Sequence, residues 1–496
     1  MGVVIKQSGI SSAITYLGAI LGFVNTVVLF PAFLSQEELG LIRVIPNIAY
    51  MLMPLAQLGL GQATLKFYPE IRKSSEALRV FNSMVIIGIF MGCAIVSIAV
   101  IVFREPIIGY FDENAQLLTS YFYVIIVLIL IYSFHTLVDI HCRIALKTVM
   151  INIVREVLIR VLMSALVGIY FLGLISFHQV ALSLILIYSI ALIVLTLYLH
   201  QIGGIVFRFK ISRLDTTLTR KIRSFALYSI IGTSGGYVIL NVDQIMISAM
   251  LNLKANAIYT TAFYFAVMIE LSRRAISQIT APLVSKSFEE KNRGEIDKIY
   301  KSTAINQFII GALVFIGITT NMDSVYELMP NGETYEAGRS VIFIIGLAKL
   351  LDMSFGANGE IISMSDHYRF NVVFMIALAT LMILFNLQLI PMYGIDGAAY
   401  ASLAALTIYN LAKLVFLWVK LRLQPFQKSS LVALAVAASV FLVIRTIPSL
   451  GHPFLDIAVR SSGTVVLYVG IMYMVKASTE FNAIVEKALK MTRILK

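Results

Sequence analysis

The sequence predicts an all-α polytopic membrane protein with about fourteen transmembrane helices. Hydrophobic residues make up 59% of the 496 residues and charged residues only 13%, whereas soluble domains hold about 45–50% and about 25%. Long apolar runs follow one another along the whole chain. Basic residues gather between alternate runs rather than on one soluble module. These three observations exclude a soluble globular protein.

Fourteen predominantly apolar stretches have the length of a transmembrane helix, about 17–25 residues. In chain order they cover residues 10–34, 41–65, 81–103, 116–139, 149–174, 178–200, 224–250, 256–282, 303–321, 338–363, 370–391, 395–419, 429–448 and 455–476. Pro46 and Pro54 interrupt the second span. The first run is longer than the core of a signal peptide and has no small-residue cleavage site, so we expect it to be a retained span.

Lysine and arginine predict how these spans are oriented. They are concentrated in one set of connections, at residues 66–79, 143–147, 208–223, 286–301, 369, 420–428 and 476–496. The other set is poor in them and carries acids such as Asp112, Glu327 and Glu333. Because basic connections stay in the cytoplasm, both termini are expected inside. The net charge of +12 thus reflects topology, and no nucleic-acid partner is expected.

A faint internal repeat relates the two halves of the chain. The segment "KQSGISSAITYLGAILGFVN", which starts at Lys6, aligns with "KIRSFALYSIIGTSGGYVILN", which starts at Lys221, at an offset of roughly 215 residues. In both halves a basic start precedes a helix with small residues and an asparagine in its outer part. Internal repeats of this kind are typical of transporters.

The eighth span carries charges where a bilayer would make them costly. Its polar residues are Glu270, Arg273, Arg274, Ser277 and Gln278. At about 100° per residue, they share one face of a helix. We expect Glu270 to pair with Arg274 in the favourable i, i+4 order, which leaves Arg273 as the freer donor to phosphate. The alternatives are a cluster that pins helices together, and snorkelling to the inner surface.

Other spans contribute further candidates for a polar cavity. They are Asn25 in the first span, Arg43 and Gln57 in the second, Glu156 and Arg160 in the fifth, and Lys349 and Asp352 in the tenth. Ionisable residues in a membrane face a bundle interior or a water-filled cavity, and arginine forms bidentate bonds with phosphate. The set therefore indicates an anionic, phosphate-bearing substrate. Structural ion pairs and hydrogen bonds between helices remain the alternative interpretation.

Two acids are candidates for coupling to a Na⁺ or H⁺ gradient. Asp243 in the seventh span has no obvious local partner, and Glu270 lies in the eighth. An acidic residue in a membrane span is a candidate functional residue, because burying its charge in a membrane is costly. No other cofactor and no metal site is expected, because Cys93 and Cys142 lack the spacing of a metal site.

No motif indicates an enzyme. The chain contains neither a G-x-x-x-x-G-K-[ST] loop nor an H-E-x-x-H zinc site. The run "GTSGG", residues 232–236, matches the nucleophile motifs of hydrolases and intramembrane proteases. The later histidines, His367 and His452, lie in connections, so the small residues are better explained by close packing of helices.

Three short stretches resemble a known family. They are "FLSQEELGLIRV" from Phe33, "NVDQIMISAMLNLKANAIYTTAFYF" from Asn241 and "NLQLIPMYGIDGAAYASLAAL" from Asn386. Each is similar to a connection between spans in polysaccharide transporters of the multidrug/oligosaccharidyl-lipid/polysaccharide (MOP) superfamily, the group that includes O-antigen flippases. Each also falls between the matching helices of this chain.

This resemblance implies a fold with a V shape. Two six-helix bundles, at residues 1–205 and 206–425, would enclose a cationic central cavity, as in multidrug exporters of the superfamily. Residues 426–496 would add two helices, which form a groove for a prenyl tail, and a basic cytoplasmic tail. In lipid II flippases of this superfamily, arginines on the first, second and eighth helices line the cavity. Arg43, Arg273 and Arg274 occupy matching helices, whereas the first helix carries Asn25 and no arginine.

The resemblance also implies a function in the bacterial cytoplasmic (inner) membrane. The chain would move a polyprenyl-pyrophosphate-linked oligosaccharide, an O-antigen, capsule or exopolysaccharide unit, from the inner to the outer leaflet by alternating access. The expected partners are this substrate, membrane lipids and the glycan polymerase or export machinery. A lipid II flippase and a cation-coupled drug exporter are the alternatives. An O-antigen polymerase and an intramembrane protease are more remote ones.

Overall fold

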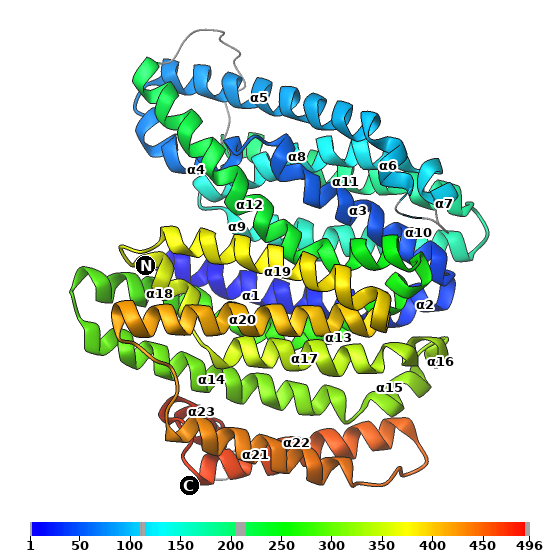
Figure 1. Cartoon of the computed structure of the whole chain (residues 1–496), viewed down its shortest axis with the longest axis vertical. Helices are drawn as coiled ribbons and strands as arrows, with labels where there is room; N and C mark the ends of the chain where they lie inside the picture. The colour runs from blue at the N-terminus through cyan, green and yellow to red at the C-terminus, as the bar shows by residue number, and fades with distance from the viewer. Residues whose placement is uncertain (1, 110, 112–114, 204–214, 492–496) are drawn as a thin grey trace. The chain divides into compact units, whose positions relative to one another are not determined.

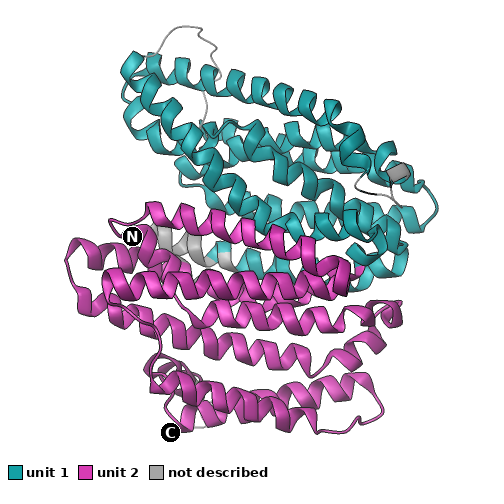
Figure 2. Cartoon of the chain, in the orientation of Figure 1, with its two compact units in different colours: residues 1–257 teal, residues 258–496 magenta. Residues whose placement is uncertain are grey.

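The computed structural model describes residues 2–109, 111, 115–203 and 215–491, and every regular element in these residues is a helix (Figure 1). The chain forms two compact units, unit 1 at Met1–Ala257 and unit 2 at Ile258–Lys496 (Figure 2). The helix α13 (Leu253–Glu289) crosses the boundary between them. The expected all-α fold is therefore confirmed.

Unit 1 contains the helices up to the start of α13. They are α1 (Gly2–Phe23), the π-helix η1 (Val24–Leu29), α2 (Phe30–Phe33), α3 (Gln36–Ala56), α4 (Leu60–Ile71), α5 (Ser75–Val102), α6 (Arg104–Gly109), α7 (Ala115–Ser120), α8 (Phe122–Ile144), α9 (Thr148–Asn152), the π-helix η3 (Ile153–Leu158), α10 (Ile159–Phe171), α11 (Phe177–Gln201) and α12 (Thr216–Met250).

Unit 2 contains most of α13 and all later helices. They are α14 (Arg293–Thr319), α15 (Met322–Leu328), α16 (Gly332–Tyr335), the 3₁₀ helix η4 (Glu336–Gly338), α17 (Arg339–Ser354), α18 (Asn358–Met364), α19 (Arg369–Tyr393), α20 (Ile395–Leu421), α21 (Lys428–Arg445), α22 (Pro453–Met474) and α23 (Thr479–Met491).

All fourteen predicted spans are helical. Among the described residues, eleven helices are long and apolar enough to cross a membrane, and α17 with α18, bent by 46°, makes a twelfth. The other two predicted spans, 149–174 and 256–282, correspond to α9–α10 and α13, and each carries three charged residues. The chain is a multi-pass membrane protein.

The helix α3 is at the centre of unit 1, where it packs against α5, α8 and α12. It begins with a capping box, in which Ser35 accepts from the Glu38 amide and Glu38 accepts from the Ser35 amide. The predicted second span is broken after Gln57, because Gly59 adopts a left-handed conformation (φ 68°) before α4 begins. Glycine is needed there, since a Cβ would lie 2.0 Å from the carbonyl oxygen of Ala226.

Unit 2 is built from helices that are neighbours in sequence. α19 and α20 form an antiparallel pair around Gly394, and α17 packs against both α14 and α20. α21 and α22 form a second pair that packs against α14. α12 packs against α3 and α4 in unit 1, so the division into units falls one helix later than the expected boundary at residue 205. The expected bundles and their V shape stay predictions.

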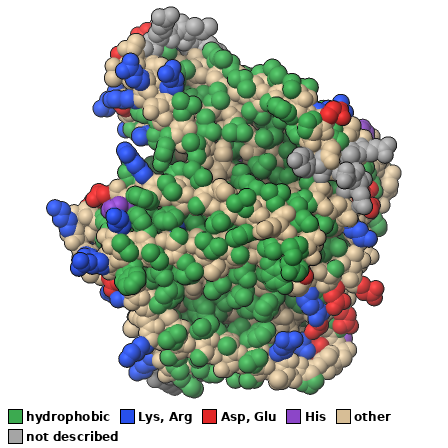
Figure 3. Space-filling model, in the orientation of Figure 1, with side chains coloured by type: hydrophobic (Ala, Val, Ile, Leu, Met, Phe, Trp, Pro, Cys, Tyr) green, Lys and Arg blue, Asp and Glu red, His purple; other side chains and the backbone are tan. Residues whose placement is uncertain are grey.

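The surface of unit 2 has the distribution expected of a membrane protein. Figure 3 shows hydrophobic side chains over the middle of its visible helices and charged side chains at their two ends. An apolar band bounded by charges is what a bilayer requires of the surface that faces lipid.

Candidate functional site

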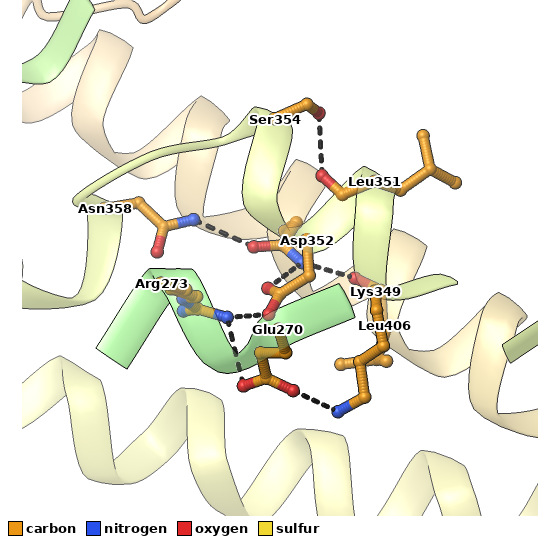
Figure 4. A network of polar contacts seen from close by, with 9 residues as sticks. Glu270, Arg273, Lys349, Leu351, Asp352, Ser354, Asn358 and Leu406 are labelled. Carbon is orange, nitrogen blue, oxygen red and sulfur yellow. Dashed lines mark hydrogen bonds and ion pairs between the residues drawn. The ribbon is translucent and has the colours of Figure 1, made fainter. Parts of the chain in front are cut away.

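The charged residues of α13 and α17 form one network in unit 2 (Figure 4). Glu270 and Arg273 are three residues apart on α13, and Lys349 and Asp352 are three apart on α17, so each pair shares a helix face. The Glu270 Oε2 lies 2.7 Å from the Lys349 Nζ, and the Glu270 Oε1 lies 3.9 Å from the Arg273 Nη1. Arg273 also donates to Asp352. Two acids and two bases thus alternate across the two helices.

Amide side chains extend this network into the core of unit 2. Asn410 on α20 donates to the Asp352 Oδ1 at 2.8 Å, and Asn358 on α18 donates to the Asn410 Oδ1 at 2.8 Å. Both asparagines are fully buried. Lys413 is also buried, with its Nζ 4.1 Å from the centroid of the Tyr409 ring. Four helices are therefore joined by buried polar contacts.

The other end of the network is open. The exposed fractions of the side chains are 21% for Glu270 and Arg273 and 17% for Lys349, against 9% for Asp352. Arg274, the next residue on α13, is exposed and forms no ion pair with a described carboxylate. Charged groups within spans face a bundle interior or a water-filled cavity rather than lipid. These residues therefore form a polar wall on α13 and α17.

The ion pairs of two arginines differ from the expected ones. Glu270 pairs with Lys349 and Arg273, and not with Arg274 as expected. Arg273, the expected free donor, is held by Asp352 and Glu270. Which of the two arginines contacts a substrate stays a prediction. The side chain of Gln278, assigned to the same face, lies outside the described residues.

In unit 1, the first and fifth predicted spans are joined through Asn25 and Arg160. Asn25 in η1 donates to the Arg160 carbonyl at 2.9 Å and accepts from Ser164 at 2.6 Å. Arg160 pairs with Glu156 at 2.7 Å and donates to the Gly18 carbonyl. Asn25 is buried, so its observed contacts are those of a link between helices.

The remaining predicted residues of unit 1 lie on α3 and α12. Gln57 is buried at the end of α3 and donates to the Ser133 carbonyl at 3.0 Å. Arg43 on α3 is half-buried, and Asp243 on α12 is buried. A hydrogen bond of 2.6 Å from Asn47 to Gln244 joins the same two helices close to both residues.

Several polar residues of the clusters were missing from the sequence analysis. Asp139 on α8 is buried and pairs with Arg155 at 2.9 Å and Arg143 at 3.5 Å. Asn410 and Lys413 in unit 2 were also overlooked. Each is a polar residue within an otherwise apolar span, and that signal was enough to find them.

The serine of the "GTSGG" run lies in the middle of α12. Its hydroxyl is buried and has no hydrogen-bond partner among the described residues. A nucleophilic serine needs a base within hydrogen-bond reach. The described surroundings of Ser234 therefore favour the packing interpretation.

Comparisons with known proteins point to membrane transport. Residues 4–288 match the model of a family described as "Polysaccharide biosynthesis protein". The chain is similar in structure to the lipid II flippase MurJ in an inward closed conformation, with a TM-score of 0.75 and 14% identity over 94% of this chain and 98% of that one. No curated protein matches the sequence.

Two further structures are transporters of the MOP superfamily. An inward-facing multidrug resistance MATE transporter has a TM-score of 0.64 and 13% identity, over 84% of this chain and 98% of that one. A transporter from Pyrococcus furiosus has a TM-score of 0.52 and 12% identity, over 84% and 94%. The shared feature at these identities is the fold.

Proposed function

Since this chain belongs to the polysaccharide biosynthesis protein family, we propose that it is a flippase for a lipid-linked oligosaccharide. It moves a polyprenyl-pyrophosphate-linked O-antigen, capsule or exopolysaccharide unit from the inner to the outer leaflet of the bacterial cytoplasmic membrane by alternating access. The fold of MOP superfamily transporters supports this proposal. The glycan polymerase or export machinery would receive the product.

The observation that carries the proposal is the polar wall on α13 and α17, which we infer to be hydrated. A pyrophosphate and its sugars cannot cross hydrocarbon unaided, because each polar group would lose its hydrogen bonds to water. Arg274 offers an exposed, unpaired guanidinium on this wall. The planar guanidinium binds phosphate through two parallel hydrogen bonds. Arg274 is therefore the residue we assign to the pyrophosphate.

The ion pairs beside Arg274 keep the affinity for an anion moderate. Glu270 and Asp352 neutralise Lys349 and Arg273, so the wall presents one unpaired cation rather than three. A flippase must release its substrate in the outer leaflet, and each 1.4 kcal/mol of additional affinity slows release about tenfold. The two carboxylates thus favour turnover over tight binding.

A paired substitution tests this site. In a deletion strain, Arg274→Gln is expected to lower the export of glycan at least about tenfold, since a hydrogen bond to a charged group is worth about 1.5–3 kcal/mol. Arg223→Gln, at another exposed arginine, is the control and is expected to export normally. Both variants must be present in the membrane at the level of the natural chain. Normal export by Arg274→Gln would refute the site.

A second experiment tests the reaction itself. Deletion is expected to trap the lipid-linked glycan on the inner leaflet, where mass spectrometry identifies it and a membrane-impermeant glycosidase cannot reach it. An unchanged distribution between leaflets would refute the flippase function. Accumulation of lipid II would instead indicate that the chain is a lipid II flippase.

The proposal includes coupling to an ion gradient through Asp243 or Glu270. Glu270 is already held by two cations, so a bound Na⁺ would have to displace one of them. Asp243 is the other candidate, because it is a carboxylate buried within a span. Export should then fail when the Na⁺ or the H⁺ gradient is dissipated, and export that survives both treatments would exclude coupling.

A further inference from the structure

A pocket with three arginines lies at one end of unit 2, away from the polar wall on α13 and α17. Its volume is about 600 Å³, within the range of about 300–1,000 Å³ that ligand pockets occupy. The arginines that line it are Arg339, Arg445 and Arg460. The distribution of basic residues predicts that this end faces the outside.

The ends of several helices bring these arginines together. Arg339 is the first residue of α17, Arg445 is the last residue of α21, and Arg460 lies in the second turn of α22. The end of α14 and the start of α15 complete the wall through Thr319, Thr320 and Asp323. All of these elements belong to unit 2.

Arg460 is a buried cation whose bonding is incomplete. Its side chain is nine-tenths buried. The two terminal nitrogens donate to the carbonyls of Thr320 at 3.0 Å and Ile447 at 3.1 Å, and the Nε has no acceptor among the described residues. Arg460 also lines the pocket, so an anion bound there would lie beside its positive charge.

The acid on the preceding turn of α22 does not complete these bonds. Asp456 precedes Arg460 by one turn of α22, but its oxygens accept from the Ser449 hydroxyl at 2.8 Å and the Leu450 amide at 2.7 Å. The carboxylate therefore acts on Arg460 at a distance rather than through a direct bond.

The other two arginines differ in their pairing. Arg339 forms ion pairs with Asp323 and Glu336, so its positive charge is largely neutralised. Arg445 is exposed and forms no ion pair with a described carboxylate. Arg445 and Arg460 thus present two guanidiniums without a directly bonded acid.

Part of the pocket lining is aromatic. Phe343 and Phe441 have ring centroids 6.2 Å apart, and both pack against Phe315. Tyr400 and Ile342 extend this wall. A free anion would gain nothing from such a surface, whereas the first carbons of a lipid chain would be shielded from water there.

We propose that this pocket binds the phosphate of an anionic lipid, with Arg445 and Arg460 as its donors and the aromatic wall against the start of its chains. This site is distinct from the site proposed for transport, and its failure would leave the flippase function untouched. An inorganic phosphate or pyrophosphate could satisfy the same arginines, so the test includes both sources.

Binding to the purified full chain in a nonionic detergent tests the proposal. The probes are dihexanoyl phosphatidylglycerol, its phosphatidylcholine counterpart and inorganic pyrophosphate. The binding of each probe is measured by calorimetry. Arg445→Gln is expected to weaken binding of phosphatidylglycerol at least about tenfold, because a charge-assisted hydrogen bond is lost. Lys254→Gln, an exposed cation outside the pocket, is expected to bind like the natural chain. Arg460→Lys keeps the positive charge but loses the planar guanidinium. Its affinity for phosphatidylglycerol is expected to lie between those of the natural chain and Arg445→Gln.

The outcomes separate the sources. If the natural chain binds phosphatidylglycerol more tightly than pyrophosphate, and Arg445→Gln abolishes this preference, the result supports a lipid as the ligand of the pocket. Equal binding of pyrophosphate that is sensitive to Arg445→Gln supports the phosphate site with a soluble source and refutes the role of the aromatic wall. Equal binding by Arg445→Gln and the natural chain, or no binding of any probe, refutes the site.

Discussion

Gly40 on α3 occupies a position where any side chain would collide with the backbone. A Cβ there would lie 2.1 Å from the Leu253 carbonyl oxygen. Gly40→Ala must push the start of α13 away from α3, and overpacking of this kind costs about 1–3 kcal/mol. We expect a lower midpoint of thermal unfolding, measured by size-exclusion chromatography of heated samples in detergent.

Gly168 on α10 provides the matched control for that substitution. No heavy atom lies within 4 Å of a Cβ built there. Alanine is favoured over glycine in a helix by about 1 kcal/mol, so Gly168→Ala should leave the midpoint unchanged or raise it. Equal midpoints for the two variants would contradict the close approach at Gly40.

The residues of the polar wall were predicted, but their pairing was not. Helical spacing placed Glu270 next to Arg274 on one helix face, and such an i, i+4 ion pair stabilises a helix by about 0.2–0.5 kcal/mol. Lys349 from another helix lies 2.7 Å from Glu270 in a partly buried site, where attraction between charges is stronger than at a surface. Local spacing cannot show which side chain of another helix comes close. For that reason Arg273, and not Arg274, is the arginine that pairs with Glu270.

At the scale of elements, the spans were predictable because hydrophobic length alone identifies them. Two irregularities inside the spans were not. The first and fifth spans contain the π-helices η1 and η3, whose residues include Asn25 and Glu156. A π turn holds more residues than an α turn, so the angle of 100° per residue used to assign helix faces fails across these segments. Only packing between helices reveals such a turn.

The helix α23 was expected to be part of a basic tail. Instead Glu480 in its first turn accepts from the Ser302 hydroxyl of α14 at 3.0 Å, and Ser478 donates to Asn306 at 2.7 Å. Desolvation acts to raise the pKa of Glu480, but its hydrogen bonds, including those from Ser302 and Thr479, outweigh it and lower the pKa below its usual value of 4.5. The ionised carboxylate therefore helps to hold α23 against α14.

This pairing predicts a pH dependence for the docking of α23. A carboxyl group whose pKa is lowered in the folded state stabilises that state above its usual pKa, and this contribution is lost as the pH falls through the lowered value. Cleavage after Lys487 by an acid-tolerant protease should thus accelerate as the pH falls below the usual value of 4.5 and through the lowered pKa of Glu480. Glu480→Gln should show faster cleavage at neutral pH and little further change on acidification. Identical cleavage profiles would rule out this role of Glu480.

For the whole molecule, the basic connections predict the side of the membrane on which each end lies. Both native cysteines are buried, so introduced cysteines can be labelled selectively. A membrane-impermeant maleimide should label Glu333→Cys in intact cells and Glu290→Cys only after permeabilisation, since both positions are exposed on predicted opposite sides. The reverse pattern would invert the topology. Parts of the inner connections used in that prediction, residues 204–214 and 492–496, lie outside the described residues.

The polar wall on α13 and α17 has one more consequence, which concerns voltage. Glu270, Arg273, Lys349 and Asp352 carry no net charge as a group, so a movement of the group through the bilayer does no work against the membrane potential. A single charge carried across the full potential contributes about 2.3 kcal/mol per 100 mV. On this wall, the electric field therefore acts on the unpaired charge of Arg274. For a pyrophosphate moving outward, the inside-negative potential would itself drive the transfer.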